Sequence, residues 1–285
     1  MKIIFLTLFL IILGLLLWVS YPITRDFYSF EQREYYEYGP DTKVKIKIDT
    51  SNMPSANAVP ILMYHGVTNK LDDENTQIDN FIKQMEMIKS QGYQTISVAE
   101  LDSFFQGKFT LPPKPIIITF DDGRKDSYYP TDDILKKLEF KATIFLATGK
   151  QAKNDKFYLN WEDLAKMKDS GRWEIEAHGR NSHDKIVINE KADMGRFLSS
   201  RIYTPGKGLE AIENFEKRVD EDYTQNIKDL KENLEIEPRY FAIPLSDYGK
   251  KPFANYPEAI AFNDHLVKKY FRINNTFRGK NPFFI

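Results

Sequence analysis

The chain has 285 residues, with 40 basic and 41 acidic side chains, a formal net charge of -1 and no cysteine. The length suits one large domain or two small ones, and the balanced charge argues against a nucleic-acid partner. The lack of cysteine excludes a disulfide framework, so a sizeable apolar core must support the fold.

The N-terminal segment is strongly apolar. Residues 3–19 read IIFLTLFLIILGLLLWV without interruption, which fits the core of a signal peptide or a short membrane span. No small-x-small cleavage site follows, and Trp18 and Tyr21 resemble interfacial anchors. We therefore expect an uncleaved membrane anchor helix in 1–22, with a cleaved signal peptide as the alternative. In both cases the rest of the chain is exported, either anchored to the membrane or secreted.

The pattern of the sequence changes near residue 58. Residues 23–57 show no sustained period of 2 or 3.6, so we expect an extracytoplasmic stalk there. From residue 58 on, apolar runs alternate with amphipathic segments. A buried strand is expected in 58–67, and a helix that ends at Gly92 comes after it.

Strands and helices continue to take turns along the chain. Strands are expected at 95–98, 115–120, 142–148, 173–178 and 239–244, and helices at 99–107, 127–138, 160–171 and 208–234. This alternation predicts an α/β layer or barrel with a parallel sheet, in which the chemistry lies past the C-terminal ends of the strands. The mixed segment 184–207 is expected to be an extended surface loop over that end.

Polar residues follow the predicted strands where a plain core would not need them. Asp121 and Asp122 come directly after one strand, and His178 and His183 come at the end of another. Alone, an Asp-Asp-Gly turn or a pair of histidines is more often structural. Adjacent carboxylates, however, call for a nearby cation, and two histidines with one carboxylate form a ligand set for a divalent metal with a position left for water.

The two aspartates can divide the chemistry between them, because successive residues at a strand end point in different directions. We assign Asp122 to the metal ion and Asp121 to the general base, although the spacing alone also permits the reverse. His65 ends the first strand and is expected to line the site. His265 lies in a helical pattern and is expected to face solvent.

The motifs TFDDG, HGRNSH and FAIPLSDYG occur in this order on successive strand–helix units. Together they resemble the polysaccharide deacetylase family of the NodB-homology type, carbohydrate esterase family four, from about residue 59 to the C-terminus. The resemblance implies a distorted (β/α) barrel domain over 58–285 that removes N-acetyl groups from an N-acetylglucosamine polysaccharide. The family's C-terminal histidine motif is not found, so a truncation of the domain at its C-terminus is also an expectation.

Residue by residue, the resemblance implies Asp121 as the catalytic base and Asp122, His178 and His183 as ligands of one divalent metal ion. Zinc is expected first, with cobalt, nickel or iron as alternatives. A second group is expected to bind the substrate: Tyr64, His65, Pro244, Leu245 and Tyr248.

Two departures from the family pattern narrow the expected substrate. Four residues separate the two histidines in place of the usual three, and FAIP replaces FRxP, so Ala242 stands where most members have an arginine. Both are similar to the poly-β-1,6-N-acetylglucosamine deacetylases of biofilm matrix synthesis. The alternatives are a peptidoglycan or chitooligosaccharide deacetylase and, in another class, a non-catalytic membrane-tethered glycan-binding module.

Overall fold

The computed structural model describes residues 58–272 except 71, 154, 248 and 250–251. All of these residues belong to one compact unit, Lys43–Ile285. The predicted anchor at 1–22 and stalk at 23–57 lie outside the described residues, as does Tyr248. In the described part of the chain, none of the helices combines the length and the apolar character needed to cross a bilayer.

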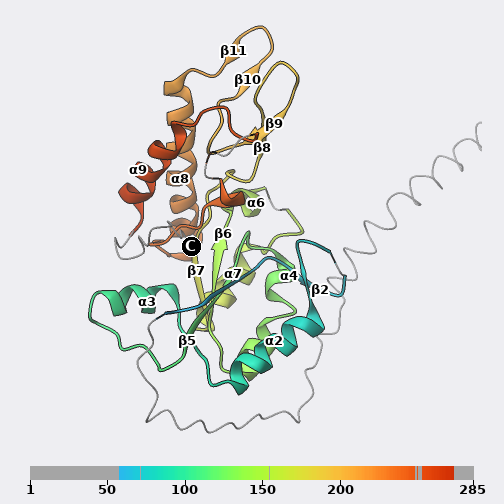
Figure 1. Ribbon diagram of the computed structural model, residues 1–285, viewed down its shortest axis with the longest axis vertical. Helices are drawn as coiled ribbons and strands as arrows, with labels where there is room; N and C mark the ends of the chain where they lie inside the picture. Colours follow the sequence, from blue (N-terminus) through green and yellow to red (C-terminus); the bar gives the residue numbers. More distant parts are fainter. Residues whose placement is uncertain (1–57, 71, 154, 248, 250–251, 273–285) are drawn as a thin grey trace, which may run out of the picture. The chain divides into compact units, whose positions relative to one another are not determined.

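A parallel sheet of five strands forms the frame of the described residues (Figure 1). Its strands are β1 (Ile61–Tyr64), β4 (Gln94–Thr95), β5 (Pro115–Phe120), β6 (Ala142–Leu146) and β7 (Trp173–Ala177). The order is β1-β5-β6-β7, β4 pairs with the start of β5, and a bridge from Ala177 to Phe241 extends the sheet. The α/β class with a parallel sheet is thus confirmed. A closed barrel would need hydrogen bonds between the segment at Phe241 and β1. The described residues form no such strand pair, so in this part of the chain the sheet is open where a barrel was predicted.

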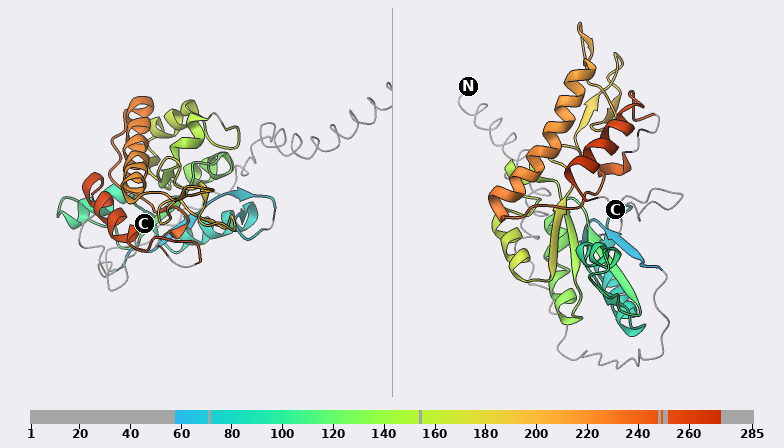
Figure 2. Two further views of the ribbon diagram at one scale, coloured as in Figure 1. Left: turned by 90° about the horizontal axis from the view of Figure 1, so that it is seen from above. Right: turned by 90° about the vertical axis from the view of Figure 1, so that its left-hand side faces the viewer.

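Helices connect and cover these strands. The right-hand view of Figure 2 shows α7 and α8 beside β7, and α2 near β1 at the opposite side of the strands. The helices are α2 (Ile78–Ser90), α3 (Val98–Phe105), α4 (Lys125–Tyr128), α5 (Asp132–Lys137), α6 (Thr148–Ala152), α7 (Trp161–Asp169), α8 (Ile212–Leu234), α9 (Ala259–Tyr270) and the 3₁₀ turn η1 (Pro244–Ser246). Capping boxes at Ser97 and Asn160 start α3 and α7, because each side chain binds an otherwise unpaired N–H group.

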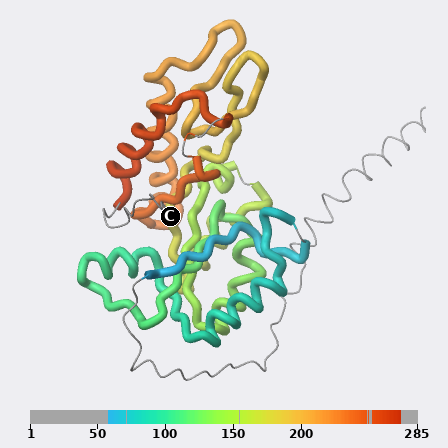
Figure 3. Tube along the Cα trace, viewed as in Figure 1, coloured from blue at the N-terminus to red at the C-terminus, as the bar shows by residue number. Residues whose placement is uncertain are grey.

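The segment predicted to be a surface loop contains short hairpins. β8 (Lys185–Val187) pairs antiparallel with β9 (Met194–Arg196), and β10 (Tyr203–Thr204) with β11 (Gly208–Leu209). Figure 3 shows the chain leaving β7, passing through these hairpins and returning along α8. Strands of two or three residues are too short to display a period of 2, which is why the sequence did not reveal them. A further short parallel pair joins β2 (Val67–Thr68) to β3 (Thr76–Gln77).

Strand alternation decides which face carries the polar strand ends. β5 is buried along its whole length, as expected for a β-branched run in a parallel sheet covered on both faces. Its even-numbered residues join the larger apolar core, whereas Ile117 joins a smaller core on the other face. In β7 the odd-numbered residues join the larger core. Asp121 is odd-numbered after β5 and His178 is even-numbered after β7, so neither continues the face of the larger core. Both therefore belong to the face of the smaller core, at the C-terminal edge of the sheet.

Candidate active site

The turn after β5 carries the two aspartates. Asp121 is buried, and its N–H donates to the carbonyl of Tyr64, which ties the turn to β1. Asp122 has a φ of 75°, a left-handed conformation that aspartate tolerates better than most residues. Gly123 has a positive φ as well, and a Cβ atom there would lie 2.1 Å from Cδ1 of Leu146. The turn therefore requires glycine at position 123.

Two histidines face Asp122. Its Oδ1 lies 2.9 Å from Nε2 of His183 and 3.6 Å from Nε2 of His178. His178 is buried at the end of β7, and its Nδ1–H donates to the carbonyl of Ala242 at 2.8 Å. Because Nδ1 is engaged in this way, Nε2 is the ring nitrogen that faces Asp122 and is available to a metal ion, an arrangement that commonly orients a metal-binding histidine. The two imidazole rings have their centroids 4.6 Å apart.

These three side chains fit a divalent metal ion. One ligand atom from each of Asp122, His178 and His183 lies within 4.8 Å of the other two. Oδ1 of Asp122 is buried and has no hydrogen-bond partner of acceptable geometry among the described residues, as expected of an oxygen that binds a cation. Three protein ligands leave a coordination position open, which is typical of catalytic and not of structural zinc sites.

Burial and charge set the protonation of the two aspartates in the metal-free protein. Burial raises the pKa of Asp121, while the charges of His178 and His65 act against this rise. Burial also acts to raise the pKa of Asp122, but its contacts with the two histidines hold that pKa well below its usual range. Asp122 is therefore ionised, as a metal ligand must be. A raised pKa suits Asp121 to accept a proton near neutral pH.

The residues predicted to bind substrate fall in different places. His65 follows β1, is half-buried and acts electrostatically on Asp121. Leu245 is 40% exposed and has a left-handed backbone, whereas Pro244 before it is buried. Both belong to η1, two residues after the carbonyl that binds His178. His265 is exposed on α9, as predicted.

Tyr64, which was also expected to bind substrate, turns its side chain into the core. Its side chain is buried, with its ring 5.2 Å from that of Phe81 and 5.5 Å from that of Phe120. Its hydroxyl donates to Gln84 at 2.7 Å. Strand alternation turns this side chain into the larger core, so Tyr64 supports Asp121 through its backbone carbonyl and does not offer its ring to a sugar.

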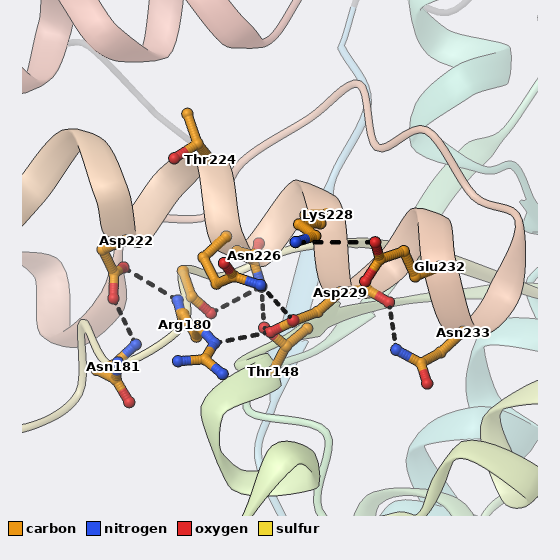
Figure 4. A network of polar contacts seen from close by, with 12 residues as sticks. Thr148, Arg180, Asn181, Asp222, Thr224, Asn226, Lys228, Asp229, Glu232 and Asn233 are labelled. Carbon is orange, nitrogen blue, oxygen red and sulfur yellow. Dashed lines mark hydrogen bonds and ion pairs between the residues drawn. The ribbon is translucent and has the colours of Figure 1, made fainter.

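Sequence reasoning missed the residues that hold the turn and the histidine loop. Arg124 donates twice to the carboxylate of Asp126, at 2.8 and 2.6 Å, immediately after the aspartate turn. On α8, Asp222, Asn226 and Asp229 are buried and bind the backbone and side chains around the histidine loop (Figure 4). Their spacing of four and three residues was visible in the sequence, but polar residues on one helix face ordinarily indicate a solvated surface.

The fold and the site together define an α/β protein with the ligand set of a mononuclear metal hydrolase at the edge of a parallel sheet. The family model for polysaccharide deacetylase matches residues 108–258, which is more than half of the chain. The chain belongs to the polysaccharide deacetylase family, and the predicted resemblance is confirmed.

Individual proteins give a consistent comparison. A protein of Escherichia coli (strain K12) named poly-beta-1,6-N-acetyl-D-glucosamine N-deacetylase is 22% identical over 208 residues, which cover 67% of this chain and 31% of that protein. A protein of the same name from Staphylococcus epidermidis is 26% identical over 154 residues, or 53% of this chain and 50% of that protein. This chain therefore spans about a third to a half of the length of these relatives.

Among solved structures, a de-N-acetylase from Aggregatibacter actinomycetemcomitans superposes with a TM-score of 0.65 at 20% sequence identity. The superposition covers 75% of this chain and 85% of that chain. At this identity the comparison shows a shared fold, which agrees with the parallel sheet described above.

Proposed function

We propose that this protein hydrolyses N-acetyl groups on an N-acetylglucosamine polymer, and that the polymer is poly-β-1,6-N-acetylglucosamine of an extracellular matrix. The observation that carries the proposal is the buried Asp121 directly beside the group formed by Asp122, His178 and His183. Family membership supports the reaction class. The names of two relatives and the four residues between the histidines support the β-1,6 linkage.

Asp122, His178 and His183 would hold one divalent metal ion, for which we propose zinc ahead of cobalt, nickel or iron. When bound, such an ion supplies Lewis acidity toward the acetamide carbonyl and lowers the pKa of water. The protein prepares the site for it: Ala242 fixes the tautomer and the orientation of His178, and the neighbouring histidines keep Asp122 ionised.

Two side chains of the protein would move the protons of the reaction. Asp121 accepts a proton from the attacking water as the water oxygen bonds to the acetyl carbon. The C–N bond then breaks, acetate leaves, and the amine needs a proton. His65 follows β1, is half-buried and acts electrostatically on Asp121 without being one of the proposed ligands. We therefore assign the protonation of the amine to His65.

We propose that the reaction takes place outside the cytoplasm, on a membrane-anchored enzyme. The support is the apolar run at residues 3–19, which lies outside the described residues. Deacetylation would leave primary amines, and these would give the neutral polymer positive charge and affinity for anionic surfaces.

The test is acetate release by the full-length chain from β-1,6-linked and β-1,4-linked N-acetylglucosamine oligomers, with mass spectrometry of the products. Release from the β-1,6 oligomers should stop with a chelator and return with added zinc. Asp121→Asn should lower kcat by about 10²–10⁴-fold. Release confined to β-1,4 oligomers would reassign the substrate to chitin-like or peptidoglycan chains. Glycan binding that survives Asp121→Asn, without any metal-dependent release, would indicate a binding module.

A further inference from the structure

The two histidines of the site are supported unequally. His178 directly follows β7, and its backbone N–H and its ring donate to the carbonyls of Leu146 and Ala242. His183 follows a loop, residues 179–182, and its Nδ1 is buried without a hydrogen-bond partner among the described residues. No bond to that nitrogen orients its imidazole, so the position of Nε2 depends on how firmly the loop is held.

One carboxylate of α8 accepts hydrogen bonds from three residues of this loop. Oδ1 of Asp222 accepts the N–H of Asn181 at 2.5 Å, and Oδ2 accepts the N–H of Arg180 at 3.0 Å. The hydroxyl of Ser182 also donates to Oδ2. Successive N–H groups that converge on one anion form a rigid concave turn. The carboxylate, which is only 4% exposed, thereby determines the path of the chain into His183.

The same face of α8 reinforces this contact one and two turns further on. The amide of Asn226 donates to the carbonyl of Gly179 at 2.8 Å and to that of Leu146 at 3.1 Å. Asp229 accepts Nε of Arg180 at 2.9 Å. Figure 4 shows these side chains directed from the helix toward the loop. The spacing of four and three residues puts all three side chains on one face of the helix.

The loop is also shaped to reach this face. Gly179 has a φ of 76°, and a Cβ atom there would lie 2.2 Å from Oγ of Ser182 and 2.9 Å from Oδ2 of Asp222. Any other residue would push the loop away from the helix. The four residues between the histidines thus form a compact turn around the Asp222 carboxylate.

We propose that Asp222 is a positioning residue that holds the loop 179–182 so that His183 can bind the metal ion. The inference rests on the proposed function for the role of His183 as a ligand. Asp222 is not one of the three proposed ligands, and its hydrogen bonds go to the loop residues Arg180, Asn181 and Ser182. A carboxylate is needed because both of its oxygens accept N–H or O–H groups, whereas the amide of asparagine offers one acceptor oxygen.

The experiment compares Asp222→Asn with Glu221→Gln in the full-length chain. Glu221 is the adjacent residue on α8, is exposed, and its substitution makes the same change of charge. Zinc affinity is measured by competition with a chromophoric chelator, urea unfolding in EDTA confirms the fold, and kcat and KM are measured at limiting and at excess zinc.

We expect Asp222→Asn to bind zinc about 10–100-fold more weakly, the range found when partners that orient a ligand are removed. KM should stay unchanged and kcat should recover with excess zinc, while Glu221→Gln behaves as wild type. A folded Asp222→Asn protein with wild-type zinc affinity would overturn the proposal. If Asp222→Asn does not fold, Ser182→Ala is tested in its place, because it removes a single hydrogen-bond donor to Asp222. Weaker zinc binding by Ser182→Ala would support the proposal, and unchanged zinc binding would refute it.

One reference variant separates this proposal from the proposed function. If His183→Ala binds zinc as tightly as wild type, His183 is not a ligand, and the positioning role fails with it. If zinc binding requires both His183 and Asp222 but no oligomer releases acetate, the positioning role stands and the proposed deacetylation fails.

Discussion

The two halves of the site are built on different principles. The half at the strand ends, with Asp121 and His178, is fixed by backbone hydrogen bonds to Tyr64, Leu146 and Ala242. Backbone groups are present whatever the side chains are, so this half follows from the sheet itself. The loop that leads to His183 has backbone bonds from Thr148 and Gly149 to its first two carbonyls, but its N–H groups are bound by side chains of α8. Single substitutions away from the site should therefore disturb the loop half much more easily than the strand half.

Asp122 lies where the two halves meet, so its loss should have the largest effect. Asp122→Asn removes the carboxylate shared by His178 and His183. Zinc affinity should fall by roughly 100-fold or more, since removing outer partners alone costs 10–100-fold. Competition titration with a chelator measures the zinc affinity. Asp121→Asn is the matched control and should keep most of its zinc affinity. If instead Asp121→Asn loses zinc and Asp122→Asn keeps it, the two aspartates have exchanged roles.

The strand half contains a buried carboxylate, Glu176, which should make the free energy of unfolding depend on pH. Burial raises the pKa of Glu176 to about 8, with a contribution from Glu174. An unfolded chain releases this proton above about pH 4.5, but the folded protein keeps it until about pH 8. The free energy of unfolding should therefore fall between these two values, by an amount on the order of 2–4 kcal/mol, and level off above.

Urea unfolding in EDTA at several pH values tests this, because the chelator removes the contribution of metal release. Glu176→Gln cannot ionise and should flatten the pH dependence in the same window. A wild-type stability that stays constant or rises from pH 5 to 8, with the variant unchanged from it, would contradict the prediction.

Metal removal should distinguish the two halves directly. A bound ion would link His183 to His178, so its loss frees the loop while β7 remains paired with its neighbours. Hydrogen exchange should show the amides of Arg180 and Asn181 exchanging about tenfold faster in EDTA. The amide of His178, bonded to Leu146, should change little. Equal acceleration in both places would show that the two halves are not held independently.

The smallest effect is expected at Tyr64. Tyr64→Phe removes the hydrogen bond to Gln84 and should cost about 1 kcal/mol of unfolding free energy. KM for the glycan oligomer should stay within about twofold of wild type, because removing a buried core hydroxyl leaves the substrate's own hydrogen bonds unchanged. A raised KM with an unchanged free energy of unfolding would indicate that the Tyr64 hydroxyl contacts the substrate.

Much of the site was predictable because it lies on long, strongly patterned elements. The apolar run of β5 predicted a buried parallel strand, and the polar residues after β5 and β7 were expected to meet at one edge of the sheet. The hairpins after β7 were not predictable, since strands of two or three residues leave no periodic signal. The orientation of the Tyr64 side chain was not predictable, because a strand's period shows which residues share a face but does not say which face meets the site.

The sequence by itself therefore determined the α/β alternation, the family and the candidate set of Asp121, Asp122, His178 and His183, because strand periodicity and motif order are local properties of the chain. Only the tertiary structure decided how that set is supported. Asp222, Asn226 and Asp229 look in the sequence like the solvated face of a helix. They become a support for the histidine loop only because the fold buries that face against residues some forty positions earlier, a contact between distant segments that no local pattern encodes.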